Sequence, residues 1–415
     1  MNVENNEKEL LLPNENQLLI SSSPHVHNGN SVPRIMLLVI LALLPAAIAG
    51  IYFWGLSALT VMLYCIVFCV TMEAACLSWQ FAKILLGSAL VLGLAFYIFN
   101  IPEIVVILTF LAITGVALTA EIIKNKKCSD YKSEALCAVK DGSAVLTGIL
   151  LAMNLAAGTP WWVCLVGAFL AIVIGKQVFG GLGNNPFNPA LVARVGLFIG
   201  FASYLSTWRP TTLMLKNSET AFNKLFLPAD KVINASTKIM DITTATPLAI
   251  AKEGGDFALL TSKTAYLSYF IGNQGGCIGE TSALALLIGA IILIWFKLIK
   301  WEVPVFFVGT VALIVTLANL FSKQPVTPNA LFHILTGGLL LGAIFMATDM
   351  VTSPSTKLGC IIFAIGCGLL TSVIRIWGNY PEGVSFSILI MNALVPMINN
   401  FTAKKPFGYV KKAEA

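Results

Sequence analysis

The residues best suited to chemistry in this chain are the hydroxyls of the segment Asp241-Ile-Thr-Thr-Ala-Thr246-Pro-Leu248, which lies in a long polar stretch between apolar segments. Thr246 has no base close to it, because all three histidines of the chain lie elsewhere in the sequence. A nucleophile of the Ser/His/Asp kind is therefore not expected. Two interpretations remain. Thr246 is either the point at which a separate enzyme attaches a cofactor, or the cap of a helix that begins at Pro247.

The composition of the chain indicates an integral membrane protein. Of its 415 residues, 57% are hydrophobic and 11% are charged, and the mean hydropathy is +0.84. A soluble domain has about a quarter charged residues. Many apolar runs reach the roughly 20 residues that a helix needs to cross the hydrocarbon core. The net charge of +6 is carried largely by lysines beside these runs, so it predicts cytoplasmic anchoring and no nucleic-acid partner.

Twelve apolar segments are long enough to be considered as membrane crossings, seven before a long polar loop and five after it. Residues 143–157 and 160–177 are short for a full crossing, and glycines and prolines follow them. The expected crossings are 35–54, 57–76, 80–99, 103–123, 143–157, 160–177, 188–204, 279–298, 303–321, 331–349, 358–376 and 383–400.

The distribution of lysines predicts the orientation of these crossings. Loops rich in Lys and Arg stay in the cytoplasm, which places the segment 124–140 and the C-terminal tail inside. Twelve crossings then leave the long loop outside and both termini in the cytoplasm. The expected organisation is a cytoplasmic tail 1–33, a first membrane half 34–204, an outer loop 205–278, a second membrane half 279–402 and a basic tail 403–415.

Two segments are expected to break helices inside the membrane. Gly180–Ala190 contains Asn185 and Asn188 among glycines and prolines, and 347–354 contains Asp349 followed by Thr, Ser and Pro. Paired breaks, one in each half, indicate a binding site between two repeats, and a carboxylate at membrane depth indicates function. We therefore predict that Asn185, Asn188 and Asp349 line one binding site. The alternative is a pair of ordinary turns capped by Asn and Asp.

Other residue types that often form sites have simpler interpretations. The nine cysteines form no CxxC pair and no cluster with histidine, so neither an iron–sulfur nor a zinc site is expected. His333 lies beside two glycines and is interpreted as a packed histidine. Glu73 is expected at a membrane interface and Glu382 in a turn. Five cysteines lie within apolar runs and are expected to be buried: Cys65, Cys69, Cys164, Cys360 and Cys367.

Several further motifs occur in a fixed order along the chain. They are Ser23-Pro-His25, Arg34-Ile-Met-Leu-Leu, Lys140-Asp-Gly-Ser-Ala-Val-Leu-Thr-Gly148, Gly180–Ala190, Ala245-Thr-Pro-Leu248, Gly276-Cys-Ile-Gly-Glu280-Thr-Ser282, Thr348-Asp349 and Tyr380-Pro-Glu-Gly383. In these motifs the chain resembles the D subunit of the Rnf complex, the membrane-bound ferredoxin:NAD oxidoreductase, from about residue 23 to residue 400. It is more distantly similar to the B subunit of the sodium-pumping NADH:quinone reductase.

The resemblance implies flavin cofactors. In the family, a flavin transferase attaches FMN through its phosphate to the last threonine of Asp-x-x-Ser/Thr-x-Ala-Thr, on the outer side of the membrane. Thr246 is the matching residue, although Asp241 precedes it by five positions where the family pattern has six. The B-subunit relative also holds a non-covalent riboflavin, and Asn185, Asn188 and Asp349 match that site. The chain has Met350 where a proline usually follows the aspartate.

The resemblance also implies a function and a set of partners. The chain would relay electrons between ferredoxin and NAD modules while Na+ or H+ crosses the bacterial cytoplasmic (inner) membrane. Its partners would be the flavin-bearing G subunit, the A and E membrane subunits, the B and C redox subunits and the flavin transferase. Ferredoxin and NAD chemistry would belong to those partners, because the chain has no nicotinamide fingerprint. The alternatives are a quinone-reductase B subunit and a solute channel.

The fold implied by the resemblance is an all-α polytopic membrane protein made of two pseudo-symmetric halves with broken helices, similar to urea channels. The family pattern passes from about residue 51 to about residue 103, which leaves 56–99 as an apparent insertion long enough for two crossings. We therefore expect ten family-like helices and two added ones. Because 56–99 is almost wholly apolar, we expect a lipid-facing hairpin that contributes to neither flavin site.

Overall fold

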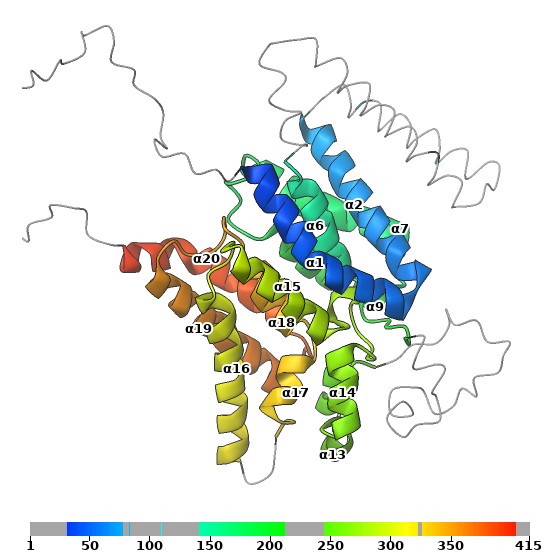
Figure 1. Cartoon of the computed structure of the whole chain (residues 1–415), viewed down its shortest axis with the longest axis vertical. Coiled ribbons are helices and arrows are strands. Elements are labelled where there is room, and N and C mark those ends of the chain that lie inside the picture. The colour runs from blue at the N-terminus through cyan, green and yellow to red at the C-terminus, as the bar shows by residue number, and fades with distance from the viewer. Residues whose placement is uncertain are drawn as a thin grey trace, which may run out of the picture.

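The computed structural model describes residues 31–77, 141–211, 245–322 and 326–403, together with Lys83 and Thr109. The regular elements in these ranges are all helices. Figure 1 shows the helices of the first half gathered on one side and those of the second half on the other, with α1 beside α15. Apart from Lys83 and Thr109, the predicted crossings 80–99 and 103–123 lie outside the described residues. Asp241 and nearly all of both tails also lie outside them.

The first half contains two long helices and several shorter ones. Their bounds are α1 Val32–Trp54, α2 Leu56–Leu77, α6 Ser143–Met153, α7 Trp161–Ala168, the π-helix η2 Phe169–Ile174, the 3-10 turn η3 Gln177–Phe179, α8 Pro189–Gly200 and α9 Ala202–Leu205. Their apolar side chains form one core that includes part of α1 and all the longer helices of this half. The π-helix η2 continues α7 and ends directly before the first break, where a widened turn is common near functional sites.

The second half begins with short helices and ends with three long ones. Their bounds are α12 Pro247–Lys252, α13 Phe257–Leu260, α14 Lys263–Ile271, η5 Ile278–Glu280, α15 Ala283–Trp295, α16 Glu302–Phe321, α17 Ala330–Leu335, α18 Leu339–Leu341, the π-helix η6 Gly342–Met346, α19 Lys357–Ile376 and α20 Val384–Thr402. Gly289 of α15 lies against the carbonyl of Ala42 in α1, where a Cβ would clash. A glycine at this point lets the two halves approach closely.

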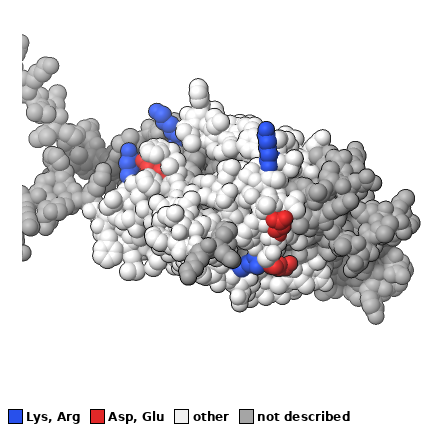
Figure 2. All heavy atoms as spheres, turned by 90° about the horizontal axis from the view of Figure 1, so that it is seen from below, with Lys and Arg blue, Asp and Glu red and all other residues white. Residues whose placement is uncertain are grey.

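The described ranges agree with a multi-pass membrane protein. They contain six helices long and apolar enough to cross a membrane, and three shorter apolar helices, α6, α8 and α15. Figure 2 shows one face on which charged side chains are few and most of the described surface is uncharged. Most predicted crossings coincide with a helix to within a few residues. The predicted crossing 331–349 is instead divided into α17, α18 and η6, because the chain leaves the helical conformation at Thr336 and Gly337 has a φ of 70°. The total of twelve crossings and the pseudo-symmetry remain predictions.

The first helix of the predicted hairpin 56–99, α2, packs one face closely against the first half, and its lipid-facing position stays a prediction. Ala58, Cys65 and Cys69 of α2 are fully buried. Gly148 of α6 lies so close that a Cβ there would be 2.7 Å from Ile66 Cα in α2. Composition could not reveal this, because a helix surface facing lipid and one facing another helix are equally apolar, and small residues distinguish the second. The rest of the hairpin, apart from Lys83, lies outside the described residues.

The end of the predicted outer loop is folded. The helices α12, α13 and α14 are capped by the residues that directly precede them, Thr246, Asp256 and Ser262. The side chain of each cap accepts a hydrogen bond from a backbone N–H of the first turn. Such residues are preferred helix caps because their oxygens pair with amide groups that have no partner within the helix. The buried side chains of these helices pack with Phe332 of α17 in a small separate core. This segment therefore belongs to the folded second half.

Candidate cofactor site between the two helix breaks

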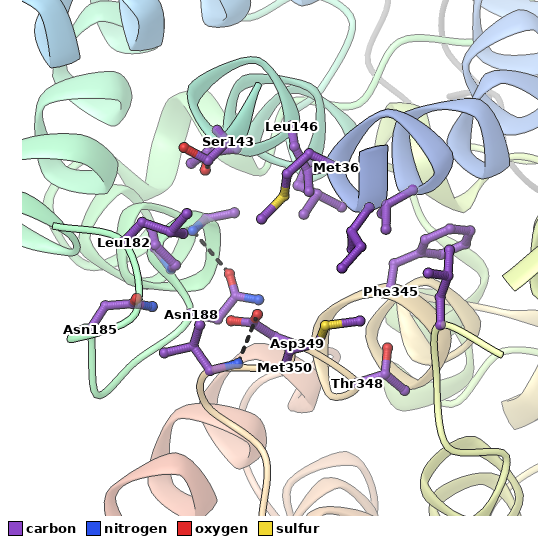
Figure 3. A pocket seen from close by; sticks show the side chains of 18 of the residues that line it. Met36, Ser143, Leu146, Leu182, Asn185, Asn188, Phe345, Thr348, Asp349 and Met350 are labelled. Carbon is purple, nitrogen blue, oxygen red and sulfur yellow. Dashed lines mark hydrogen bonds between the residues drawn. The ribbon is translucent and has the colours of Figure 1, made fainter. Parts of the chain in front are cut away.

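The two predicted breaks meet at one cavity. The first follows η2 and contains Gly180, Gly181 and Gly183 with φ angles of 105°, 90° and 94°, which side chains other than glycine rarely adopt. The second follows η6 and continues to the start of α19. A cavity of about 120 Å³ lies between them and includes Asn185, Asn188 and Asp349 in its wall. Figure 3 shows the side chains of Asn188 and Asp349 near the middle of this wall. The structure thus brings the three predicted residues together.

Asn188 connects the two breaks. Its Oδ1 accepts a hydrogen bond of 3.1 Å from Ala190 N and caps α8. Its Nδ2 donates a hydrogen bond of 3.3 Å to the carbonyl of Met346, the last residue of η6. Only 3% of Asn188 is exposed. One amide therefore fixes the start of a helix in the first half and the end of a helix in the second.

Asn185 carries an acceptor that the described part of the chain leaves without a partner. Its Nδ2 donates to the carbonyl of Phe187 at 3.0 Å. Its Oδ1 is buried, and no hydrogen-bond donor of the described residues reaches it. A buried amide oxygen normally has a donor. Asn185 therefore offers a place for an N–H or O–H group of a ligand or a water molecule.

Asp349 closes the turn that follows η6. One carboxylate oxygen accepts a hydrogen bond of 3.4 Å from Val351 N, and the other accepts one of 3.2 Å from Thr352 Oγ1. This is the local pairing by which aspartate stabilises turns. Met350 also lines the cavity, and the turn forms without the proline that the family usually has there. The turn interpretation of Asp349 and its place in the cavity wall are both correct.

The cavity wall combines polar and apolar side chains. The polar part is made by the three predicted residues together with Ser143, Thr147, Lys176 and Thr348. The apolar part is made mainly by Ile35, Met36, Val39, Leu146, Leu150, Leu293 and Phe345. Small-molecule sites commonly combine an apolar lining with a few polar groups that fix the orientation of the ligand.

A buried ion pair beside the cavity was not expected from the sequence. Lys176 Nζ pairs with Glu73 Oε1 of α2 and donates a hydrogen bond of 2.6 Å to Ser143 Oγ. Gln177 Nε2 donates to the same Glu73 oxygen at 3.2 Å. Lys176 and Glu73 are 2% and 1% exposed, so the expectation of Glu73 at an interface is wrong. The signal was present: two opposite charges each lie within an apolar segment, and such charges normally find each other.

Thr246 does not line the cavity. It is 4% exposed, and its Oγ1 accepts a hydrogen bond of 3.2 Å from Ala249 N at the start of α12. The capping interpretation of Thr246 is therefore confirmed. The cap uses a lone pair of the oxygen and not the O–H bond that a flavin transferase would replace. Covalent attachment stays a prediction that this geometry allows.

A second buried polar cluster joins α8 to the segments that precede α15 and α20. Arg194 Nη2 lies 3.4 Å from Cys277 Sγ and 3.3 Å from Glu382 Oε2. Cys277, Glu280 and Glu382 bring their ligand atoms within 4.8 Å of one another, as a metal site would. The guanidinium of Arg194 already supplies the cation at this place, so we interpret the cluster as an ion-pair network between the halves. Glu382 lies between α19 and α20, as the turn interpretation predicted.

The remaining sequence interpretations concern single residues. His333 is 3% exposed, its Nε2 lies 2.5 Å from Thr327 Oγ1, and its carbonyl accepts a hydrogen bond of 2.7 Å from Arg375 Nη1. The interpretation of His333 as a packed residue is confirmed. The cysteines expected to be buried are buried, and all cysteines of the described ranges are free thiols.

Comparison with known proteins identifies the family. The model of the NQR2, RnfD, RnfE family matches residues 19–114 and 84–408. The chain belongs to the NQR2, RnfD, RnfE family. Within it, the chain is 37% identical over 406 residues to the D subunit of the Na+-translocating ferredoxin:NAD+ oxidoreductase complex of Acetobacterium woodii, and the match covers 97% of this chain and 99% of that protein.

Two other members of the NQR2, RnfD, RnfE family are similar to the same extent. The D subunit of the proton-translocating ferredoxin:NAD+ oxidoreductase complex of Clostridium ljungdahlii is 37% identical over 398 residues, or 95% of this chain and 97% of that protein. The D subunit of the ion-translocating oxidoreductase complex of Stutzerimonas stutzeri is 37% identical over 389 residues, or 91% and 93%. Because relatives named for Na+ and for protons match equally well, overall similarity does not select the ion.

Proposed function

We propose that this chain is the D subunit of an ion-translocating ferredoxin:NAD+ oxidoreductase. It relays electrons through the bacterial inner membrane while Na+ or H+ is moved outward, with both termini in the cytoplasm. The support is the match to D subunits along almost the whole length of both chains. These relatives favour a D subunit over the quinone-reductase B subunit. The partners proposed for it are the G, A, E, B and C subunits and a flavin transferase.

The site that we assign to this function is the cavity between the helix breaks, with a non-covalent flavin such as riboflavin as its ligand. The carrying observation is that Asn185 lines the cavity and has a buried Oδ1 that lacks a donor among the described residues. The ring system of a flavin has a pyrimidine edge with an N–H between two carbonyls and an apolar dimethylbenzene edge. The lining offers both polar groups for the first edge and apolar side chains for the second, so the types of residue present fit the group.

The residues of the chain would have separate roles toward this ligand. Asn185 would accept the ring N–H, and Asn188 would hold the two breaks together through Ala190 and Met346. Asp349 would keep the second break in its turn. A bound flavin would supply the electron-transfer chemistry, while the apolar part of the wall keeps water away from it.

Thr246 is the second proposed flavin site, with FMN joined to its Oγ1 through the phosphate. The family motif and the outward loop predicted from charge support this assignment. Because Oγ1 is buried at the start of α12, attachment requires the first turn of this six-residue helix to open. Helices this short are marginal by themselves, so we propose that the flavin is attached before α12 packs against α17.

One experiment tests both flavin sites. The full-length chain is produced with its partner subunits and flavin transferase and is then denatured. We expect fluorescence of the polypeptide band, an FMN-sized mass addition that Thr246→Ala removes and Thr244→Ala retains, and release of a second flavin into the supernatant. A band without fluorescence, or a mass addition that persists in Thr246→Ala, would refute the covalent assignment. A supernatant without flavin would refute the cavity assignment.

A further inference from the structure

Lys176 is the cationic residue in the wall of the cavity, and it comes from the end of the α7–η2 segment. The ammonium group has three N–H donors. Within the ranges that the structure describes, Glu73 and Ser143 account for two of them. Ser143 is itself a lining residue, so the ammonium lies at the wall and not behind it. One donor of a buried charge is therefore available to a ligand.

Glu73 fixes where this ammonium lies. It reaches Lys176 from α2, and Gln177 Nε2 binds the same carboxylate oxygen at 3.2 Å. All but 1% of Glu73 is buried, in a helix held against α6 by close packing at Gly148. A lysine side chain is long and flexible, and an anchored carboxylate removes much of that freedom. The position of the donor is thus set by α2, which the sequence had suggested was unrelated to the site.

Asn185 and Lys176 together determine which hydrogen-bonding groups a ligand must present to the wall. Asn185 Oδ1 lacks a donor among the described residues, and Lys176 Nζ has one N–H beyond those that Glu73 and Ser143 accept. The pyrimidine edge of a flavin presents an N–H next to carbonyl oxygens, which meets both requirements.

We propose that Lys176 donates a hydrogen bond to a carbonyl of the flavin ring bound in this cavity, and that Glu73 is the positioning residue that holds Lys176 there. This inference rests on the proposed flavin site. The consequence is twofold. A charge-assisted hydrogen bond strengthens flavin binding, and a nearby positive charge stabilises the additional electron density of the reduced ring, so it raises the midpoint potential.

A purely structural ion pair between α2 and η2 is the alternative explanation of the same contacts. It predicts that removal of the pair changes the stability of the protein but neither the affinity for flavin nor its potential. A single Lys176→Met substitution would leave Glu73 buried and unpaired, which is strongly destabilising. The double variant Lys176→Met/Glu73→Gln removes both charges at nearly constant volume and avoids this problem.

The experiment measures the non-covalent flavin of the purified full complex in four variants. These are Lys176→Met/Glu73→Gln, Lys176→Arg, Glu73→Gln and the control Lys252→Met. Lys252 also has two backbone acceptors, the carbonyls of Tyr380 and Ile374, but does not line the cavity. Flavin released by denaturation is quantified per protein, the dissociation constant of added riboflavin is measured after its removal, and the midpoint potential is titrated spectroscopically.

We expect the double variant to bind riboflavin about ten- to hundredfold more weakly, as the loss of a hydrogen bond to a charged group predicts. If the ammonium favours the reduced ring tenfold, the one-electron potential falls by about 59 mV in the double variant. Lys176→Arg keeps a charged donor and recovers most of the potential. Glu73→Gln leaves the buried ammonium without its counter-ion and therefore also lowers the stability of the protein. Its loss of affinity is smaller than that of the double variant, because the donor stays. Lys252→Met retains wild-type flavin content.

Two results would overturn the inference, and they distinguish failure of the cavity function from failure of the role of Lys176 alone. Wild-type complex without any releasable flavin would refute the proposed cavity function and the role of Lys176 together. Wild-type complex that releases flavin, with a double variant that matches it in dissociation constant and potential, would leave the cavity function intact and show that the ion pair is structural.

Discussion

The double role of Asn188 leads to a prediction that separates helix capping from the connection between the halves. Its Oδ1 caps α8 through Ala190 N at 3.1 Å, and its Nδ2 binds the Met346 carbonyl at 3.3 Å. Asn188→Ser keeps an oxygen that can cap the helix but is too short to reach Met346. Asn188→Ala removes both interactions. The two variants therefore differ by the cap alone.

The expected magnitudes follow from these two contacts. Loss of a helix cap costs about 0.5–2 kcal/mol, and a buried carbonyl left without its donor costs about 1–3 kcal/mol. We expect Asn188→Ser to lose about 1–3 kcal/mol and Asn188→Ala about 1.5–5 kcal/mol, because its two losses are independent and add. Both variants should release less non-covalent flavin than the wild type, since the contact between the breaks is lost in both.

The assay combines thermal unfolding of the purified full-length protein in detergent, followed by tryptophan fluorescence, with flavin released per protein. Ser282→Ala is the matched control. Ser282 caps α15 through Ala285 N at 3.3 Å and does not line the cavity. It should lower the melting temperature while it retains flavin. If Asn188→Ser keeps wild-type flavin and melting temperature, or if Ser282→Ala loses flavin to the same extent, the assigned connection between the breaks is wrong.

Three further predictions concern the cavity, the covalent site and the packing of α2. Asn185→Ala and Asp349→Ala should each lower releasable flavin and leave the Thr246 label in place; unchanged flavin and unchanged ion dependence in both variants would contradict their place in one site. Thr246→Ala should lose the FMN label and also weaken α12 by about 1 kcal/mol through the lost cap. An FMN-sized mass addition that persists in this variant would show that the label is attached to another residue. Gly148→Val should prevent α2 from packing on α6, because a Cβ there meets the α2 backbone at 2.7 Å, whereas Gly309→Ala, which meets nothing within 4 Å, should be tolerated. Equal yields of these two glycine variants in size-exclusion profiles would show that the close approach is not required.

The local structure of this protein could be predicted from its sequence. Apolar runs of helical length marked nearly every described helix, because only a helix satisfies its backbone hydrogen bonds within the bilayer. Thr246 followed by Pro247 marked the start of α12, and the glycines of 180–183 marked a break, because their positive φ angles exclude most other residues. The order of the motifs also indicated the family. These features depend on neighbours in the chain, and they can therefore be read from it.

The helices that surround the site and the charges that meet there follow from tertiary packing. Glu73 and Lys176 are about a hundred positions apart, and their pairing depends on the packing of α2 against α6 and η2. The same packing buries one face of α2, whereas its composition does not show which face, if any, contacts protein. Asn185, Asn188 and Asp349 were named from the sequence, but the cavity that joins them exists only because the two halves bring their breaks together. In a membrane the lipid and the protein interior are equally apolar, so hydrophobicity identifies the helices and the contacts of small and polar residues decide how they are arranged.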